Sequence, residues 1–468
     1  MVTNVTGKYL KMKIHILGIC GTFMGGLAQI LIEKGHNVSG SDKQFYPPMS
    51  DQLDSLGVEM IEGYEESVLP AADLYVIGNA LSRGNPSVEY ILSHKLDYTS
   101  GPKMLGEIIQ DKTVIAVSGT HGKTSTSFLI CEIFEAQGID VGFLVGGVSN
   151  SFKNSARLGT SDFFIIEADE YDSAFFDKRS KFVHYMPEIV VVNNIEFDHA
   201  DIFNNIEEIK LSFKRMLNIV PENGIVFVNG DDNDAVEVTE NCRAPVIKVG
   251  ANDDCDFKIE NLNLESFNSS FSIKDNSYQL PLDGEFNVRN AAMAIAVSDF
   301  LNIDQKNIIE SVSKFSGIAR RQELRGEEKN VKVIDDFGHH PTAIAATIGA
   351  LKQRYPDSKI WAIFEPRSNT SRRNLLQSEL EDSLSQADGV IISEVPNPEK
   401  VPDGELLDVE TVIENLSSKG KEAFIGLSSD DIVNKLIPLT SSGDTIVVLS
   451  NGGFGGIHEK LLEALKVK

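Results

Sequence analysis

Cysteine and tryptophan are scarce in this sequence. Its 468 residues include one tryptophan and four cysteines, which lie far apart at Cys20, Cys131, Cys242 and Cys255. No two of them form a CxxC pair, so the spacing argues against a disulfide framework or a cysteine-bound zinc ion. Free thiols are typical of a reducing compartment, and we therefore expect a cytoplasmic protein.

Positive charge and long apolar runs are also in short supply. Lysine and arginine total 43 against 69 acidic residues, which gives a formal net charge of -26. Such a surface repels nucleic acid and anionic membranes unless a local basic patch intervenes. The segment 1–18 has no apolar core of signal-peptide length, and no apolar run approaches the roughly 18 residues of a membrane span. We expect neither a nucleic-acid partner nor membrane insertion.

The sequence does contain three successive series of short β-branched runs that alternate with helical stretches. This pattern is typical of α/β domains in which helices cover mostly parallel sheets. We therefore predict three domains, at residues 1–106, 107–316 and 317–468. A polar, strand-like insert at 255–282 interrupts the second series. The clearest expected strands are 13–17, 76–78, 113–117, 163–166, 189–192, 331–334, 360–364 and 445–449.

A glycine-rich loop follows the second domain's first expected strand. The run 113–117 leads, before an expected helix, into Gly119, Thr120, His121, Gly122, Lys123, Thr124 and Ser125. Backbone N–H groups and the positive end of the helix dipole then converge on one point, which suits a triphosphate. Lys123 is expected to contact the β and γ phosphates, and the Thr124 hydroxyl to bind Mg²⁺. The loop departs from the general P-loop pattern at Val117, where glycine is usual.

Two further residues follow strands of the same predicted domain. Glu167 comes after the run 163–166, and His199 comes after the run 189–192. Ligands of α/β sheets gather at the carboxyl ends of the strands, and carboxylate and imidazole groups bind metal ions there. We predict that Glu167 and His199 lie near the metal ion that accompanies ATP.

The first predicted domain has a glycine-rich turn of its own. Gly18, Gly21 and Thr22 follow its first strand, Asp42 ends the next strand, and Asn79 follows a later one. This arrangement is close to a dinucleotide-binding fingerprint, although the glycine spacing is not GxGxxG. From the residues alone, NAD and another nucleotide such as a uridine diphosphate are both open.

The segment Ser118–Ser125 resembles the phosphate loop of the Mur ligases and folylpolyglutamate synthases. Three more segments, at 284–292, 317–323 and 335–342, resemble Mur ligase motifs. The resemblance implies a three-domain Mur ligase architecture: a Rossmann-like UDP-binding domain, a P-loop ATPase domain and a C-terminal Rossmann-like domain. It also implies adenine recognition by Asn290, a phosphate clamp at Arg321, Asp336 beside the ATP ribose or metal, and metal binding by Thr124, Glu167 and His199. Gly18, Gly21, Thr22, Asp42 and Asn79 would hold the UDP of a muramyl substrate.

The resemblance further implies an ATP-dependent amide ligase of peptidoglycan recycling. Its expected substrates are UDP-N-acetylmuramate and the tripeptide L-alanyl-γ-D-glutamyl-meso-diaminopimelate, which are joined through an acyl phosphate. Arg367 is expected to bind a carboxylate of the peptide. The alternatives are a ligase that adds L-alanine alone, an NAD-dependent oxidoreductase, and a P-loop regulator. We expect a monomer or a weak homodimer.

Overall fold

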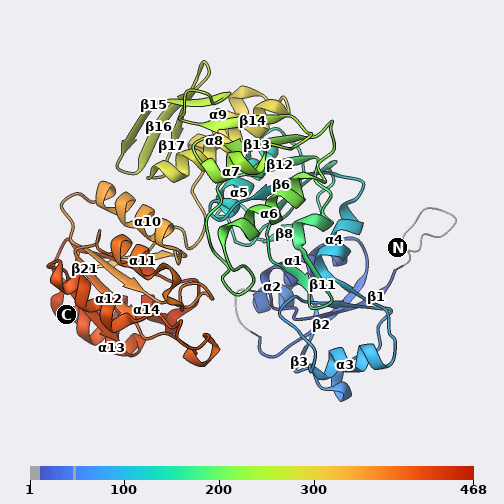
Figure 1. The fold of residues 1–468 in the computed structure, drawn as a ribbon, viewed down its shortest axis with the longest axis horizontal. Coiled ribbons are helices and arrows are strands. Elements are labelled where there is room, and N and C mark those ends of the chain that lie inside the picture. Colours follow the sequence, from blue (N-terminus) through green and yellow to red (C-terminus); the bar gives the residue numbers. More distant parts are fainter. Residues whose placement is uncertain (1–10, 46–48) are drawn as a thin grey trace.

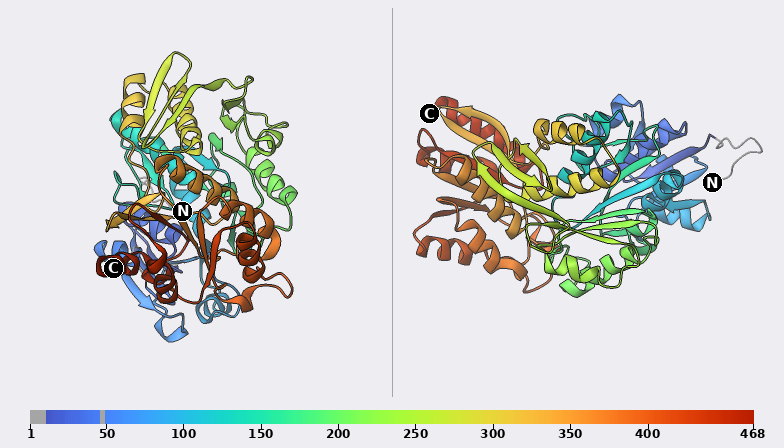
Figure 2. Two further views of the ribbon diagram at one scale, coloured as in Figure 1. Left: turned by 90° about the vertical axis from the view of Figure 1, so that its left-hand side faces the viewer. Right: turned by 90° about the horizontal axis from the view of Figure 1, so that it is seen from above.

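The computed structural model describes residues 11–45 and 49–468, so the first ten residues of the predicted first domain lie outside it. Three α/β units follow one another along an elongated molecule, and the C-terminal unit lies at the end opposite the first (Figure 1; Figure 2, right). Each unit has its own sheet. The α/β fold with three mostly parallel sheets is therefore confirmed. Among the described helices, none has both the length and the apolar character needed to cross a membrane.

The first sheet has five parallel strands in the order β3-β2-β1-β4-β5. Its central strand, β1, has the sequence KIHIL and is buried at every position after the first, as expected for a strand covered on both faces. The strands are β1 (Lys13–Leu17), β2 (Asn37–Asp42), β3 (Glu59–Glu62), β4 (Leu74–Ile77) and β5 (Tyr98–Ser100). The helices are α1 (Thr22–Glu33), α2 (Met49–Ser55), α3 (Pro86–Ser93) and α4 (Gly101–Ile109).

The middle sheet has ten strands, in the order β17-β16-β15-β14-β13-β12-β6-β9-β7-β8. Its centre is parallel, and β6 lies between β12 and β9. The parallel part contains β6 (Thr113–Ser118), β7 (Gly142–Leu144), β9 (Phe163–Ala168), β12 (Ile189–Val192), β13 (Ile225–Asn229) and β14 (Val246–Gly250), and β8 (Ala156–Arg157) pairs antiparallel at one edge. The helices are α5 (Lys123–Ala136), α6 (Ile206–Leu217), α7 (Asn233–Val238), α8 (Glu285–Phe300) and α9 (Gln305–Lys314).

The polar, strand-like insert predicted at 255–282 consists of three strands that extend this sheet. Strand β15 (Phe257–Glu265) pairs parallel with β14, and β16 (Asn268–Ile273) and β17 (Asn276–Leu280) continue as an antiparallel meander. Alternate residues of β16 are buried, which is the pattern of a sheet with one face toward the core. A separate two-stranded hairpin, β10 (Asp172–Ala174) and β11 (Asp177–Ser180), lies beside α4.

The third sheet has six strands in the order β18-β19-β23-β20-β21-β22, and only β18 runs antiparallel. Its strands are β18 (Glu323–Glu328), β19 (Val331–Asp336), β20 (Ile360–Phe364), β21 (Gly389–Ser393), β22 (Glu422–Gly426) and β23 (Thr445–Leu449). The helices around it are α10 (Pro341–Arg354), α11 (Gln377–Leu384), α12 (Val409–Ser418), α13 (Ser429–Leu436) and α14 (Ile457–Val467).

The first two units are joined by a shared hydrophobic core, whereas the C-terminal unit has cores of its own. One continuous cluster of buried side chains runs from Ile14 in the first sheet through Val114 to Ala244 beside the middle sheet, so the first two units share a core. The two clusters on the faces of the third sheet contain only residues from Val331 onward. The C-terminal unit is therefore attached to the rest of the molecule through its linker and through mainly polar contacts.

Candidate active site

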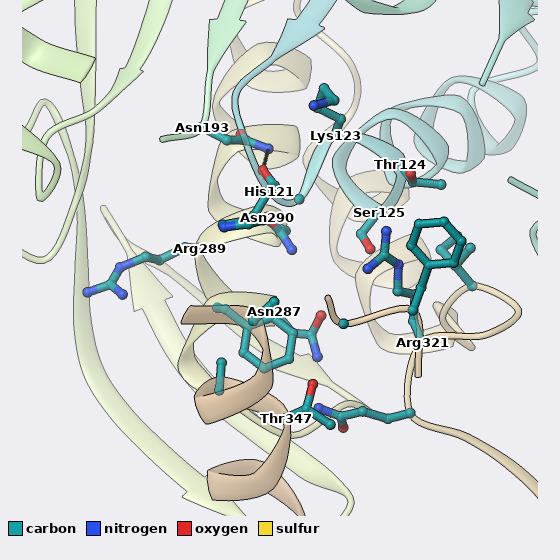
Figure 3. A pocket seen from close by; sticks show the side chains of 18 of the residues that line it. His121, Lys123, Thr124, Ser125, Asn193, Asn287, Arg289, Asn290, Arg321 and Thr347 are labelled. Carbon is teal, nitrogen blue, oxygen red and sulfur yellow. Dashed lines mark hydrogen bonds between the residues drawn. The ribbon is translucent and has the colours of Figure 1, made fainter. Parts of the chain in front are cut away.

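The phosphate loop lies between β6 and α5, where the sequence predicted it. Gly119 has a φ of +126° and Gly122 a φ of +82°, a region that favours glycine. A Cβ atom on Gly122 would lie 2.1 Å from Asn290 Oδ1, so the loop backbone packs directly on α8. Because α5 begins at Lys123, its first free N–H groups face the same cavity (Figure 3).

The segment after β12 holds this loop in place. Asn194 accepts a hydrogen bond from His121 N at 2.7 Å, and Asn193 Nδ2 donates to His121 O at 3.3 Å (Figure 3). Thr120 Oγ1 accepts from Glu196 N at 2.9 Å. The loop is therefore shaped before any nucleotide binds, which lowers the entropic cost of binding one.

Lys123 lies among carboxylates. Its Nζ donates to Gly119 O at 2.5 Å and lies 3.8 Å from Glu170 Oε2. Burial by itself would lower the pKa of Lys123, but Glu170, Asp169 and Glu167 outweigh it and leave the pKa raised. The side chain thus keeps its charge for an anionic ligand, and a triphosphate can displace its contact with the loop carbonyl.

Glu167, at the end of β9, has one carboxylate oxygen in use and one free. Its Oε2 accepts a hydrogen bond from Gly146 N at 2.8 Å. Its Oε1 is buried and has no hydrogen-bond partner among the described residues. A buried carboxylate oxygen without a partner is unfavourable unless a cation binds it. This oxygen and the nearby Thr124 hydroxyl, which line the same cavity, fit a hard divalent cation such as Mg²⁺.

His199 lies in the same cavity but is engaged with another residue. It has a φ of +56°, and its Nε2 is 3.0 Å from Glu170 Oε1. Burial opposes its charge, yet Glu170 and Asp198 raise the pKa of His199 to about 9. The protonated imidazole has no free lone pair, so metal binding by His199 requires loss of this proton and of the contact with Glu170.

A large cavity, with a volume of about 700 Å³, lies between the middle and C-terminal units. It brings together residues from the phosphate loop, from α8, from the segment between α9 and β18, and from α10, such as Lys123, Asn290, Arg321 and Thr347 (Figure 3). Apart from Gly119, all the residues expected to contact ATP line it: Thr120, His121, Gly122, Lys123, Thr124, Ser125, Asn290, Arg321 and Asp336, together with Glu167 and His199.

Arg321, in the segment between α9 and β18, and Asp336, at the end of β19, differ in how freely their side chains can reach a ligand. The Arg321 guanidinium lies over the Phe337 ring, 5.1 Å from its centroid, on an exposed side chain that has room to move. The buried Asp336 instead accepts from Gln322 N at 2.9 Å and from Gly338 N at 2.7 Å. Arg321 is therefore available to a phosphate, whereas Asp336 mainly holds the turn in place. Burial keeps the pKa of Asp336 raised.

A second cavity, of about 370 Å³, lies between the first and middle units. The residues expected to bind UDP all line it: Gly18, Gly21, Thr22, Asp42 and Asn79. Asp42 accepts hydrogen bonds from Cys20 N at 2.9 Å and Tyr64 OH at 3.2 Å, which fix it at the end of β2. The cavity therefore continues from the glycine turn of the first unit toward the middle sheet.

The two cavities meet at Gly146 and Glu167, which line both of them. A molecule bound in the second cavity can thus reach the position where the loop holds a terminal phosphate. The geometry suits transfer of a phosphoryl group between two separately bound molecules, because both can be held in reacting orientation.

Several residues of this junction were not among those that the sequence singled out. Glu170 has a fully buried side chain, and Lys181 lies in the second cavity with its Nζ 3.1 Å from Asp169 Oδ2. The acidic run after β9 was visible in the sequence, but not which of its carboxylates turns inward. Lys181 comes from the segment after the β10–β11 hairpin, whose placement depends on tertiary packing.

Arg367 is placed apart from both cavities. Its side chain is about half exposed, and Nη1 lies 4.0 Å from Glu365 Oε1 on the C-terminal unit. Arg372 lies nearby. Burial lowers the pKa of Arg372 most, and the positive charge of Arg367 lowers it further. The expected binding of a peptide carboxylate by Arg367 stays a prediction.

Comparisons with known proteins match this architecture along the chain. Three family models match: "Mur ligase family, catalytic domain" at residues 13–113, "Mur ligase middle domain" at 117–298, and "Mur ligase, glutamate ligase domain" at 320–452. The UDP-N-acetylmuramate–L-alanyl-γ-D-glutamyl-meso-2,6-diaminoheptandioate ligase of Escherichia coli is 42% identical over 466 residues, which cover 98% of this chain and 99% of that protein. A UDP-N-acetylmuramate–L-alanine ligase of Clostridium acetobutylicum is 33% identical over 457 residues, covering 96% and 97%.

Solved structures show the same relationship. A murein peptide ligase from Psychrobacter arcticus superimposes with a TM-score of 0.73 at 39% identity and covers 97% of this chain and 99% of its own. The UDP-N-acetylmuramate-alanine ligase of Thermotoga maritima has a TM-score of 0.79 at 20% identity, again with 97% and 99% covered, and so shows the shared fold alone. The chain belongs to the Mur ligase family, a family of ATP-dependent ligases.

Proposed function

We propose that this ligase joins UDP-N-acetylmuramate to the tripeptide L-alanyl-γ-D-glutamyl-meso-diaminopimelate, with conversion of ATP to ADP and phosphate. The observation that carries the proposal is the junction of the two cavities at Gly146 and Glu167, beside Lys123. The similarity to the Escherichia coli ligase so named supports the choice of substrates. An NAD-dependent oxidoreductase would leave the phosphate loop and the larger cavity without a role.

The first step activates the muramyl carboxylate. Held in the second cavity, it attacks the γ-phosphorus of ATP in line, and ADP leaves as the acyl phosphate forms. Lys123 lies at the start of α5 with its charge retained, and Arg321 lies on the opposite wall of the cavity. Both side chains can contact the developing negative charge on the transferred group.

The second step uses the amine of the peptide. It attacks the acyl carbon, passes through a tetrahedral oxyanion and expels inorganic phosphate as the amide forms. Water must be kept out, since it would hydrolyse the acyl phosphate. The C-terminal unit covers the phosphate loop, with Thr342 Oγ1 2.6 Å from Glu196 Oε2, so closure of this unit performs that exclusion.

Mg²⁺ is part of the proposal for an electrostatic reason. Four carboxylates, Glu167, Asp169, Glu170 and Asp198, act together to raise the pKa of Lys123, and they would repel a γ-phosphate bound beside that side chain. Thr124 and Glu167 would hold the ion, with His199 as a third ligand after deprotonation. When bound, Mg²⁺ would neutralise part of the negative charge of the phosphates and polarise the phosphoryl oxygens on which further charge develops during transfer. The proposed division of labour places UDP binding in residues 1–106, ATP binding in 107–316 and peptide binding in 317–468.

Phosphate release with two amines tests the choice of substrate. The protein is incubated with ATP, Mg²⁺ and UDP-N-acetylmuramate, and turnover with the tripeptide is compared with turnover with L-alanine. We expect faster release with the tripeptide. Faster turnover with L-alanine would reassign the chain to alanine addition, and no release with either amine would refute the ligase proposal.

A further inference from the structure

One cluster of metal-binding side chains lies outside the proposed Mg²⁺ site. His121 comes from the phosphate loop, Glu196 from the segment after β12, and His340 from the turn before α10. One ligand atom from each lies within 4.8 Å of the others. His121 Nε2 is 3.5 Å from Glu196 Oε2, and His340 Nδ1 is 3.2 Å from the same oxygen. The first two residues belong to the middle unit and the third to the C-terminal unit.

These separations match a metal ion of the zinc class. With Zn–N and Zn–O bonds of roughly 2.0–2.1 Å, two donors on a tetrahedral ion are about 3.3 Å apart. The two measured separations bracket that value. Two imidazoles and one carboxylate are also a ligand set that zinc uses in proteins, whereas Mg²⁺ prefers oxygen donors alone. The third separation, between the two imidazole nitrogens, is within 4.8 Å.

The tautomer of His340 is fixed in the way that metal binding requires. Its Nε2 lies 3.2 Å from the carbonyl oxygen of Phe197, which can only accept a hydrogen bond, so Nε2 carries the proton. The single lone pair of Nδ1 accepts a long 3.4 Å hydrogen bond from Thr342 N, the N-cap contact of α10, and Nδ1 lies 3.2 Å from Glu196 Oε2. A metal ion would replace that long hydrogen bond. An outer hydrogen bond to a backbone carbonyl is the usual support of a metal-binding histidine.

The contact between His340 Nδ1 and Glu196 Oε2 is otherwise unfavourable. With the proton on Nε2, both of these atoms carry lone pairs and repel each other. His121 Nε2 is buried and makes no hydrogen bond to any described residue. Thr342 Oγ1, 2.6 Å from Glu196 Oε2, orients the carboxylate as an outer partner. A divalent cation at the centre would satisfy all three ligand atoms at once.

We propose that His121, Glu196 and His340 form a site for a divalent transition-metal ion of the zinc class that joins the middle unit to the C-terminal unit. The site is separate from Thr124, Glu167 and His199. It stands on side-chain geometry and does not depend on the identity of the ligase substrates. An ion bound there holds the C-terminal unit against the phosphate loop.

Cobalt and zinc binding to the full chain test the site. The protein is prepared without a polyhistidine tag, which would itself bind these metals, and a chelator removes any bound metal. Excess Mg²⁺ is then added to occupy the separate Mg²⁺ site. Co²⁺ is followed by its visible absorption and Zn²⁺ by calorimetry. We expect one site per chain with the spectrum of nitrogen and oxygen ligands, without the intense thiolate bands that the cysteines would give. Zn²⁺ should also raise the melting temperature, because it binds only the folded chain.

Variants assign the ligands. H121N and H340N should each weaken Zn²⁺ binding by at least ~10–100-fold. That is the usual loss when a residue that only hydrogen-bonds to a metal ligand is removed, and removal of a ligand itself should cost no less. Asparagine can cap a helix, so H340N should leave the start of α10 intact. H121N tests a second ligand that lies on a loop, where no helix cap is changed. The matched controls H339N and E167Q should bind Zn²⁺ as the parent does. Unchanged binding in H121N and H340N, loss of binding in E167Q, or no Zn²⁺ binding in the parent chain would overturn the proposal.

Discussion

Lys123 lies in strongly acidic surroundings that a bound nucleotide would change. Without nucleotide its charge is balanced by Glu170 and by the other carboxylates after β9, and its Nζ contacts a carbonyl of its own loop. A triphosphate would take over that contact and present its negative charge where the phosphoryl group is transferred. In the proposed reaction the side chain would act on charge that develops in the transition state, which is where an interaction accelerates chemistry.

The variant Lys123→Ala should lower kcat for phosphate release by at least ~10²–10³, the usual effect of removing one preorganised electrostatic contact. The control Lys306→Ala removes an exposed lysine at the start of α9 and should leave turnover unchanged. Steady-state phosphate release measures both, and circular dichroism checks that each chain is folded. Retention of more than a tenth of the parent turnover in Lys123→Ala would contradict the assigned role.

His15, in β1, is the second residue whose chemistry predicts a measurable effect. It is fully buried, and its ring nitrogens lie 2.9 Å from Ser39 Oγ and 2.8 Å from Ser41 Oγ. Burial lowers the pKa of His15 from 6.5 to about 4. The unfolded chain therefore binds a proton at His15 between those two values while the folded chain does not, so acid favours unfolding in this window.

Lowering the pH from 6.5 to 5 should cost about 2 kcal/mol of the free energy of unfolding through His15, at ~1.4 kcal/mol per pH unit. His15→Gln keeps a group that can hydrogen-bond both serines but does not titrate, so its stability should fall less over the same range. Urea unfolding at pH 7 and pH 5 measures the difference between parent and variant. Equal losses in the two proteins would exclude His15 as the titrating group.

Helix α5 offers a matched pair of glycines for a test at the level of an element. Gly122 precedes its first residue with a φ of +82°, and Gly138 follows its end with a φ of +81°. A Cβ on Gly122 would lie 2.1 Å from Asn290 Oδ1, whereas one on Gly138 would have nothing within 4 Å. An alanine at either position would therefore adopt the same unfavourable left-handed backbone conformation, but only the alanine at 122 would also clash with Asn290.

Gly122→Ala and Gly138→Ala should each lose ~1–2 kcal/mol of stability from the left-handed conformation. Only Gly122→Ala should also weaken ATP binding, because the loop must move off Asn290 to admit the methyl group. Calorimetric titration with ATP and Mg²⁺, together with thermal unfolding, separates the two effects. Equal ATP affinity in both variants would show that the packing of the loop on α8 does not shape the nucleotide site.

The elements that the sequence predicted well are those with a strong local pattern. The run Ile360–Phe364 is a strand with those bounds, and the helix expected after Pro341 begins there, because a buried parallel strand and a proline at a helix start are local signals. The polar insert at 255–282 was less clear, since its three strands have one exposed face. The Glu170–His199 contact depends on two strands coming together, so no local pattern reveals it.

At the scale of the whole molecule, the distribution of hydrophobic cores was not predictable from the sequence. Three similar α/β series suggest three equivalent units, yet the first two share one continuous core and the third has its own. The difference arises from contacts between elements far apart in sequence, such as α1 against β8.

Between the middle and C-terminal units the contacts include a buried Arg354–Asp283 ion pair and the hydrogen bond from Thr370 Oγ1 to Asp198 Oδ1 at 2.6 Å. Such contacts can open and close without exposing a core, which suits a unit that admits substrates.

Because of this division, the chain should unfold in two cooperative steps, one for the first two units together and one for the C-terminal unit. Three buried leucines test it: Leu27 in the first unit, Leu217 in the middle unit and Leu384 in the C-terminal unit. Each leucine-to-alanine change should cost ~2–5 kcal/mol. In differential scanning calorimetry, Leu27→Ala in α1 and Leu217→Ala in α6 should lower the same transition, although they belong to different units, and Leu384→Ala should lower the other. A single transition that all three variants shift alike would mean that the polar contacts couple the C-terminal unit to the rest as tightly as a shared core does.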